Sequence, residues 1–226
     1  MGGLSRRAAL AAGLSLLMVS GAAAQQKEGP PPIKSVFKYL DAYWKIPAAE
    51  RSRFTLAYYM KGPNGAAPAG VKMYVVQGGE RTALDIASNG RVELPTLAML
   101  NSKGATIDVQ KPNPDLKLNL TMSLEPAARP ATRMPAAELA GAIDQANRGI
   151  KRAAGVLRMA VPTMGSVRGV GAGSGEVVMS DGRRAPLPVA SGAPIFTPAS
   201  WPGATTVVFA STPTRLEIGS PPKAKK

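Results

Sequence analysis

The sequence predicts an α+β fold of two similar units of mainly antiparallel strands, each with one amphipathic helix. Three observations predict this class. Several short runs alternate apolar and polar residues, as strands with one buried face do. One longer segment in each half repeats apolar residues every three or four positions, which is the period of an amphipathic helix. Turn and apolar residues of the first half recur roughly 100 positions later.

The N-terminus is predicted to be a secretory signal peptide over residues 1–24. Arg6 and Arg7 precede an uncharged, largely apolar stretch that closes on three alanines. A permanent membrane anchor is disfavoured, because the apolar run is shorter than the ~20 residues that span a bilayer. The arginine pair resembles a twin-arginine export signal, and this route and general secretion both stay open. We therefore expect a periplasmic or secreted protein with no transmembrane segment after cleavage.

The first unit is predicted over residues 33–125, after a flexible leader at residues 25–32. The leader is rich in Gln and Pro and has no apolar period. A helix is expected from residue 33 to residue 44, limited by Pro47. Its apolar residues fall on one face: Ile33, Val36, Phe37, Leu40, Tyr43 and Trp44.

Strands are expected next. Residues 54–60 and 71–75 alternate apolar and polar side chains across a Gly/Pro-rich loop, and we expect these two strands to pair. Asn89-Gly90 suits the two positive φ angles of a type I′ turn, so a hairpin is predicted around it.

The rest of the first unit is predicted to be a short helical turn followed by two strands. The turn covers residues 96–103 and stops at Gly104. A short strand covers residues 107–109, and residues 116–124 carry five apolar side chains in strict alternation. That alternation is the strongest strand signal in the chain.

The second unit is predicted over residues 135–219, after a proline-containing linker at residues 126–134. A helix over residues 136–151 and strands near residues 156–161 and 176–179 are expected. A basic tail, residues 220–226, ends the chain.

Residue matches between the halves suggest a duplicated unit, although chance is the alternative in a chain rich in Ala, Gly and Pro. Leu84, Ile86, Ala87 and Ser88 match Leu187, Val189, Ala190 and Ser191; Gly90 matches Gly192; Gly104, Ala105, Val109 and Pro114 match Gly203, Ala204, Val208 and Pro213; Leu116 and Leu118 match Leu216 and Ile218.

Composition excludes much enzyme chemistry. The 226 residues contain no His and no Cys. The chain therefore cannot build a Ser-His-Asp or Cys-His nucleophile, an ordinary zinc site, a Cys-bound iron–sulfur cluster or a disulfide. No cofactor is expected.

Three weak chemical signals have simpler explanations. Ser35-Val36-Phe37-Lys38 spells the S-x-x-K motif of penicillin-binding proteins, but the companion motifs are missing and a solvated helix face explains it. The glycine run at residues 169–175 fits no nucleotide-binding spacing and is predicted to be a flexible loop. Asp85 and Glu93 flank the predicted hairpin on its polar side, so we expect both to face water.

Positive charge is the feature of the sequence that indicates most about the class of partner. The chain has 28 Lys and Arg against 14 Asp and Glu, a net charge of +14. Helical spacing places one basic cluster opposite the apolar stripe of the second helix. Such a surface suits anionic lipid head groups or acidic glycans, although a merely solvated face is the alternative. The candidate anion-binding residues are Arg148, Lys151, Arg152, Lys223, Lys225 and Lys226.

Trp201 lies in a turn-rich segment where its indole could stack on a sugar ring or close over the edge of the core. Nucleic acid is not expected as a partner, because basic residues are not interleaved with aromatic ones. We expect a non-enzymatic envelope protein that acts as an interaction or binding module. The alternative is a cofactor-free periplasmic hydrolase that uses Ser/Lys or carboxylate groups. The sequence identifies neither a protein partner nor an oligomeric state.

Overall fold

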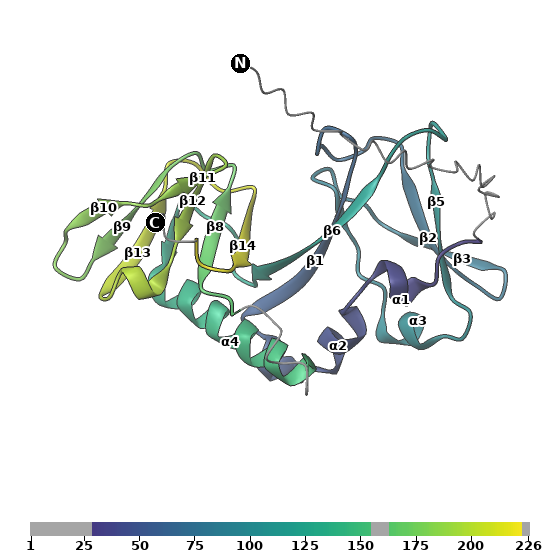
Figure 1. Cartoon of the computed structure of the whole chain (residues 1–226), viewed down its shortest axis with the longest axis horizontal. Coiled ribbons are helices and arrows are strands. Elements are labelled where there is room, and N and C mark those ends of the chain that lie inside the picture. The colour runs from purple at the N-terminus through teal and green to yellow at the C-terminus, as the bar shows by residue number, and fades with distance from the viewer. Residues whose placement is uncertain (1–28, 155–162, 223–226) are drawn as a thin grey trace, which may run out of the picture.

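The computed structural model describes residues 29–154 and 163–222 and confirms the α+β class with mostly antiparallel sheet (Figure 1). The predicted signal peptide, the predicted strand at residues 156–161 and the end of the basic tail lie outside the described residues. Three antiparallel sheets and four α-helices make up the described part of the chain.

The largest sheet joins both halves of the chain. Its seven strands lie in the order β11 (Val189–Ala190), β12 (Ala193–Phe196), β8 (Ser166–Val170), β14 (Arg215–Gly219), β6 (Asn119–Pro126), β1 (Phe54–Lys61) and β4 (Arg91–Val92). The halves meet where β14 pairs with β6, with Ile218 opposite Leu124. In Figure 1, β6 and β1 run through the middle of the molecule, between the two groups of smaller strands.

Each half also contributes a smaller sheet. The first is β3 (Glu80–Leu84), β2 (Lys72–Gln77) and β5 (Thr106–Gln110); the second is β10 (Arg184–Pro186), β9 (Gly175–Met179), β13 (Ala204–Phe209) and β7 (Arg133–Pro135). The predicted pairing of the first two strands is wrong, since β1 pairs with β4 and β6 while β2 pairs with β3 and β5. The Gly/Pro-rich loop between β1 and β2 crosses from one sheet to the other instead of closing a hairpin.

The two halves share one order of strand pairing. β1 lies between β4 and β6 as β8 lies between β12 and β14, and β2 lies between β3 and β5 as β9 lies between β10 and β13. The matches of Leu116 and Leu118 with Leu216 and Ile218 do not hold, because the first pair precedes β6 and the second lies within β14. The agreement in pairing is consistent with a duplicated unit, which stays a prediction.

The single helix predicted for residues 33–44 is wrong, although its buried face is right. The segment forms α1 (Ile33–Val36) and α2 (Leu40–Lys45), separated by Tyr39 in the left-handed region with φ 68°. Phe37 and Leu40 are buried, as the period predicted. A contact from β1 satisfies the backbone at this break, because the Tyr58 hydroxyl donates to the Lys38 carbonyl. In a continuous helix that carbonyl would accept a hydrogen bond from a backbone amide of the next turn.

The hairpin around Asn89-Gly90 is confirmed, but the type I′ turn is wrong. Ile86 bridges Val92, and the Gly90 amide donates to the Ala87 carbonyl at 2.7 Å. Gly90 alone adopts positive φ, 85°, whereas a type I′ turn would require positive φ at Asn89 as well.

Strand β8 occupies part of the predicted glycine loop. A Cβ atom at Gly169 would lie 2.6 Å from Cε1 of Phe209, a ring that is itself buried. Glycine is therefore present here because the Phe209 ring covers the strand, a close approach that only a residue without a side chain permits.

The remaining helices agree with the predictions. Helix α3 (Leu97–Asn101) is N-capped by Thr96, whose hydroxyl accepts from the Met99 amide at 3.2 Å. Helix α4 (Ala136–Ala154) packs on β1, β13 and the short 3-10 helix η1 (Ala48–Arg51). Its buried side chains recur with helical spacing: Ala136, Leu139, Ala142, Ile143, Gln145 and Ala146.

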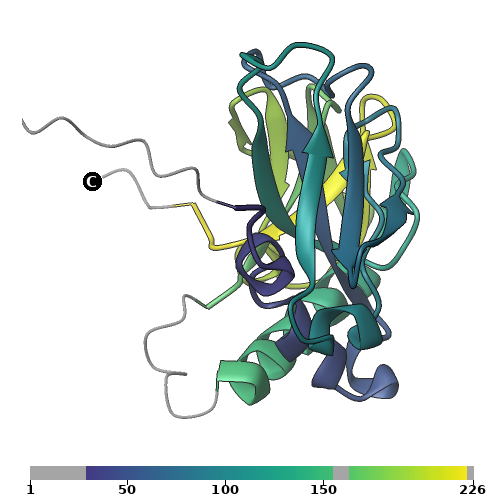
Figure 2. The same cartoon turned by 90° about the vertical axis from the view of Figure 1, so that its right-hand side faces the viewer.

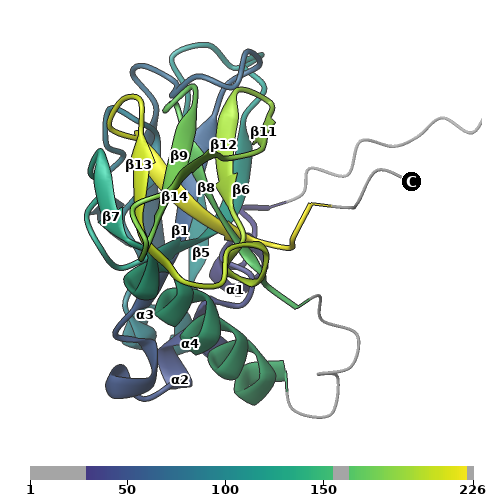
Figure 3. The same ribbon diagram turned by 90° about the vertical axis from the view of Figure 1, so that its left-hand side faces the viewer.

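The helices lie together on one side of the molecule, at one end of the strands (Figure 2 and Figure 3). None of those in residues 29–154 and 163–222 combines the length and apolarity needed to cross a bilayer. The last leader residues also belong to the fold, because Ile107 donates its amide to the Pro31 carbonyl at 2.9 Å and Pro32 bridges to Thr106.

Candidate functional site

The basic residues predicted on α4 are exposed, but they differ in their contacts. Arg148, Lys151 and Arg152 all lie opposite the buried side of the helix. Arg152 forms an ion pair with Glu50 of η1, and the hydrogen bond to Glu50 raises the pKa of the Arg152 guanidinium. Arg148 and Lys151 have no carboxylate within 4.0 Å among the described residues. The free positive charge on this surface therefore comes from Arg148 and Lys151.

The other predicted site residues are not brought to this surface by any described contact. Lys223, Lys225 and Lys226 lie outside the described residues. Trp201 follows the 3-10 helix η3 (Pro198–Ser200) and packs, partly buried, against the core. Packing against the core explains why an apolar ring occupies this position, and sugar stacking by Trp201 stays a prediction.

The weak chemical signals receive simple structural explanations. The Ser35 hydroxyl donates to the Pro32 carbonyl at 2.7 Å, and no hydrogen bond in the described part of the chain joins it to Lys38. Asp85 and Glu93 are both exposed, as predicted. No group of three or more acidic residues that could hold a metal ion occurs within the described ranges.

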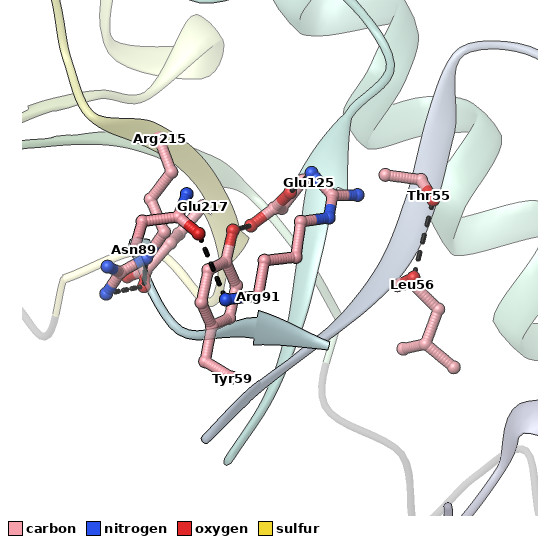
Figure 4. Close-up of polar contacts among 8 residues, drawn as sticks. All are labelled: Thr55, Leu56, Tyr59, Asn89, Arg91, Glu125, Arg215 and Glu217. Carbon is pink, nitrogen blue, oxygen red and sulfur yellow. Dashed lines mark hydrogen bonds and ion pairs between the residues drawn. The ribbon is translucent and has the colours of Figure 1, made fainter. Parts of the chain in front are cut away.

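A buried polar cluster that the sequence did not reveal lies in the large sheet, beside the pairing of β6 with β14 (Figure 4). Glu125 of β6 is only 5% exposed and is the one buried charged residue of the described chain. The hydroxyl of Tyr59 on β1 donates to Glu125 Oε1 at 2.6 Å, and Arg91 of β4 lies 3.1 Å from Glu125 Oε2. These three residues therefore link three neighbouring strands of the first half.

The second half contributes Arg215 and Glu217 of β14 to this cluster. The guanidinium of Arg215 on β14 lies 5.0 Å from the centre of the Tyr59 ring, and Arg215 Nη2 lies 2.7 Å from Glu217 Oε1. A cation over an aromatic face is attracted by the ring electrons. The cluster thus spans β4, β1, β6 and β14, and it crosses the junction between the two halves.

Electrostatic effects of opposite sign act on the carboxyl of Glu125. Burial raises the pKa of Glu125, against the opposing effects of the Tyr59 hydrogen bond and of Arg91 and Arg215. Burial and the hydrogen bond to Glu125 raise the pKa of Tyr59 above its ordinary value. Tyr59 therefore keeps its proton at neutral pH and acts as the donor.

The buried pair Tyr59 and Glu125 lies away from the surface cavities, whereas Glu217 lines one of them. Three surface cavities of about 400–500 Å³ flank the sheets, and neither Tyr59 nor Glu125 lines any of them. Tyr59 is itself 2% exposed. The buried hydrogen bond between Tyr59 and Glu125 and the Arg215 guanidinium over the Tyr59 ring therefore form a structural contact between the halves.

No protein family, curated protein or solved structure matches the chain.

Replacing Glu125 by glutamine is expected to remove a pH dependence of stability. A carboxyl whose pKa is raised on folding contributes stability that is complete below its ordinary pKa, 4.5 for glutamate, and is lost as the pH rises through the raised value. Glutamine keeps an acceptor for Tyr59 and carries no charge. In urea unfolding, the stability of wild type relative to Glu125→Gln should therefore fall as the pH rises from about 5 to about 8. A wild type that gains stability over the variant as pH rises would contradict this account.

Proposed function

We propose that the protein is an exported, non-enzymatic module of the bacterial envelope that binds an anionic component through the exposed basic surface of α4. Suitable partners carry phosphate or carboxylate groups, as anionic lipid head groups and acidic glycans do. The observation that carries the proposal is the pair Arg148 and Lys151, which are exposed and have no ion-pair partner among the described residues.

The charge of the whole chain and its expected export support this proposal. A chain with 28 basic and 14 acidic residues is attracted to anionic surfaces before any specific contact forms. The signal peptide expected at residues 1–24 would deliver the chain to the envelope, where lipid head groups and acidic glycans are present and nucleic acid is not a usual partner.

The hydrolase alternative finds no support at Ser35 or at the buried carboxyl of Glu125. Ser35 is engaged with a backbone carbonyl and Glu125 is buried without a cavity. Glycoside hydrolases that use two carboxyl groups need both of them to reach the scissile bond of the substrate. We therefore propose binding, and not turnover, as the activity.

Reversing both free charges of α4 tests the proposal. The double variant Arg148→Glu with Lys151→Glu should bind vesicles containing phosphatidylglycerol, or an acidic polysaccharide, roughly 30-fold more weakly at low salt. That estimate takes about 1 kcal/mol for each basic residue near an anionic surface. Folding should be nearly unchanged, because exposed substitutions cost within about 0.5 kcal/mol each.

The matched control is Lys72→Glu with Lys117→Glu, which changes the net charge equally. Both lysines are exposed, and they lie on β2 and just before β6, outside the helices. The control should retain most of the binding. Equal losses in the two double variants would show that net charge, and not the α4 surface, governs binding.

A further inference from the structure

Tyr39 adopts an unfavourable backbone conformation, and packing of its side chain does not offset the energetic cost. Its φ of 68° lies in the left-handed region, which only Tyr39 and Ser191 adopt among the described residues other than glycine. An L-residue with a Cβ atom is disfavoured there, and glycine or asparagine is the usual choice. A buried aromatic ring could offset that cost, but Tyr39 is 68% exposed.

The surrounding structure explains the backbone of Tyr39 and leaves its side chain unexplained. Phe37 and Leu40 are 1% and 0% exposed, and the Lys38 carbonyl is held by the Tyr58 hydroxyl. Both constraints force a tight turn between α1 and α2. Neither requires an aromatic residue at the turn. Strain of this kind concentrates at sites that contact ligands, which favours a role for the Tyr39 ring outside the molecule.

The segment that carries Tyr39 contains three lysines and one acidic residue, Asp41, which pairs with Lys45, and it lies on the helical side of the molecule. Lys34 and Lys38 are exposed in the same segment. Helix α4, which carries Arg148 and Lys151, lies on that side too, and α2 contacts α4 (Figure 2). Basic residues around an exposed aromatic ring are typical of surfaces that sit on anionic membranes, where tyrosine occupies the head-group region.

The geometry favours a membrane over a single sugar. Tyr39 lines none of the three cavities of about 400–500 Å³, whereas small ligands are usually held in concave sites. The basic residues are instead spread over α1, α4 and the turn that follows α1, as contact with an extended anionic surface requires. We propose that Tyr39, with Lys34 and Lys38, contacts an anionic lipid membrane and places its ring among the head groups. This inference rests on the proposed function and specifies its partner.

Vesicle sedimentation with Tyr39→Asn tests the inference. Asparagine tolerates the left-handed conformation, so the variant should unfold at the same temperature as wild type or higher. Its binding to vesicles of equal parts phosphatidylcholine and phosphatidylglycerol should fall roughly five-fold, by the loss of one interfacial side chain. The control Val189→Asn removes another exposed apolar side chain, on strand β11, and should bind as wild type does.

A fluorescent label gives a second readout of direct contact. The chain contains no cysteine, so Ser35→Cys on α1 and Val189→Cys each provide a single labelling site. An environment-sensitive dye at residue 35 should shift its emission to shorter wavelength when these vesicles are added. The same dye at residue 189 should not shift.

The outcomes separate this inference from the proposed function. Equal vesicle binding by wild type and Tyr39→Asn, or no shift of the dye at residue 35, would overturn the role of Tyr39 and leave binding through α4 intact. Binding of wild type to a soluble acidic polysaccharide, but not to the vesicles, would overturn the membrane as partner. Binding to neither would refute the proposed function as well.

Discussion

Alanine at Gly149 is expected to destabilise the protein, whereas alanine at Gly141 is not. Both glycines lie within α4, so both substitutions gain the same helix preference, about 1 kcal/mol. At Gly149 the added Cβ would lie 2.8 Å from Phe54 Cζ and 3.2 Å from Ile46 Cδ1, and both of these side chains are buried. At Gly141 the closest contact is the end of the Arg53 side chain, which can move into solvent.

Denaturant unfolding of the two variants measures the difference. Overpacking a closed core costs about 1–3 kcal/mol, so Gly141→Ala should exceed Gly149→Ala in free energy of unfolding by about that amount. The helix preference cancels in this comparison, which leaves the packing of α4 against Phe54 and Ile46. Equal stabilities would mean that α4 does not approach Phe54 as closely as described.

Removing the hydroxyl of Tyr59 should produce the other large effect. Tyr59→Phe leaves Glu125 buried without its hydrogen bond from β1, and an unsatisfied buried polar group costs about 1–3 kcal/mol. Arg91 remains as the second partner of Glu125. Urea unfolding at neutral pH should show the full loss.

The control is Tyr74→Phe, because the Tyr74 ring lies beneath Arg81 and its hydroxyl makes no hydrogen bond within the described ranges. It should unfold within about 0.5 kcal/mol of wild type. Adding Glu125→Gln to Tyr59→Phe should recover part of the loss, since a neutral amide costs less to bury than a carboxylate. If Tyr59→Phe behaves like the control, Glu125 does not depend on Tyr59.

The sequence predicted elements better than it predicted their pairing. Alternation and helical period are local signals, so the strand at β6, the hairpin before β4 and the buried side of α4 could be read directly. Pairing depends on contacts far apart in the chain, which is why the partner of β1 was missed. The break at Tyr39 depends on Tyr58, and the strand at Gly169 depends on Phe209.

The candidate site was likewise predictable only in those parts that depend on local sequence. Helical spacing was sufficient to place Arg148, Lys151 and Arg152 on the exposed side of α4. The neutralisation of Arg152 by Glu50 was not predictable, because 102 positions separate the two residues. Tyr59 and Glu125 are 66 positions apart and occupy the polar positions of their strands. Strand β1 is nonetheless buried on both faces, which depends on the elements that pack over the sheet and not on local alternation.

The salt dependence of wild-type binding to phosphatidylglycerol vesicles tests the central claim most directly. Contacts between exposed Arg148 and Lys151 and an anionic surface are screened as the Debye length falls from about 30 Å at 0.01 M salt to about 8 Å at physiological ionic strength. Sedimentation should therefore show strong binding at the low salt concentration and a steep loss towards the physiological one. Absence of binding at low salt, or binding that salt does not weaken, would contradict the proposal that this protein acts through its basic surface.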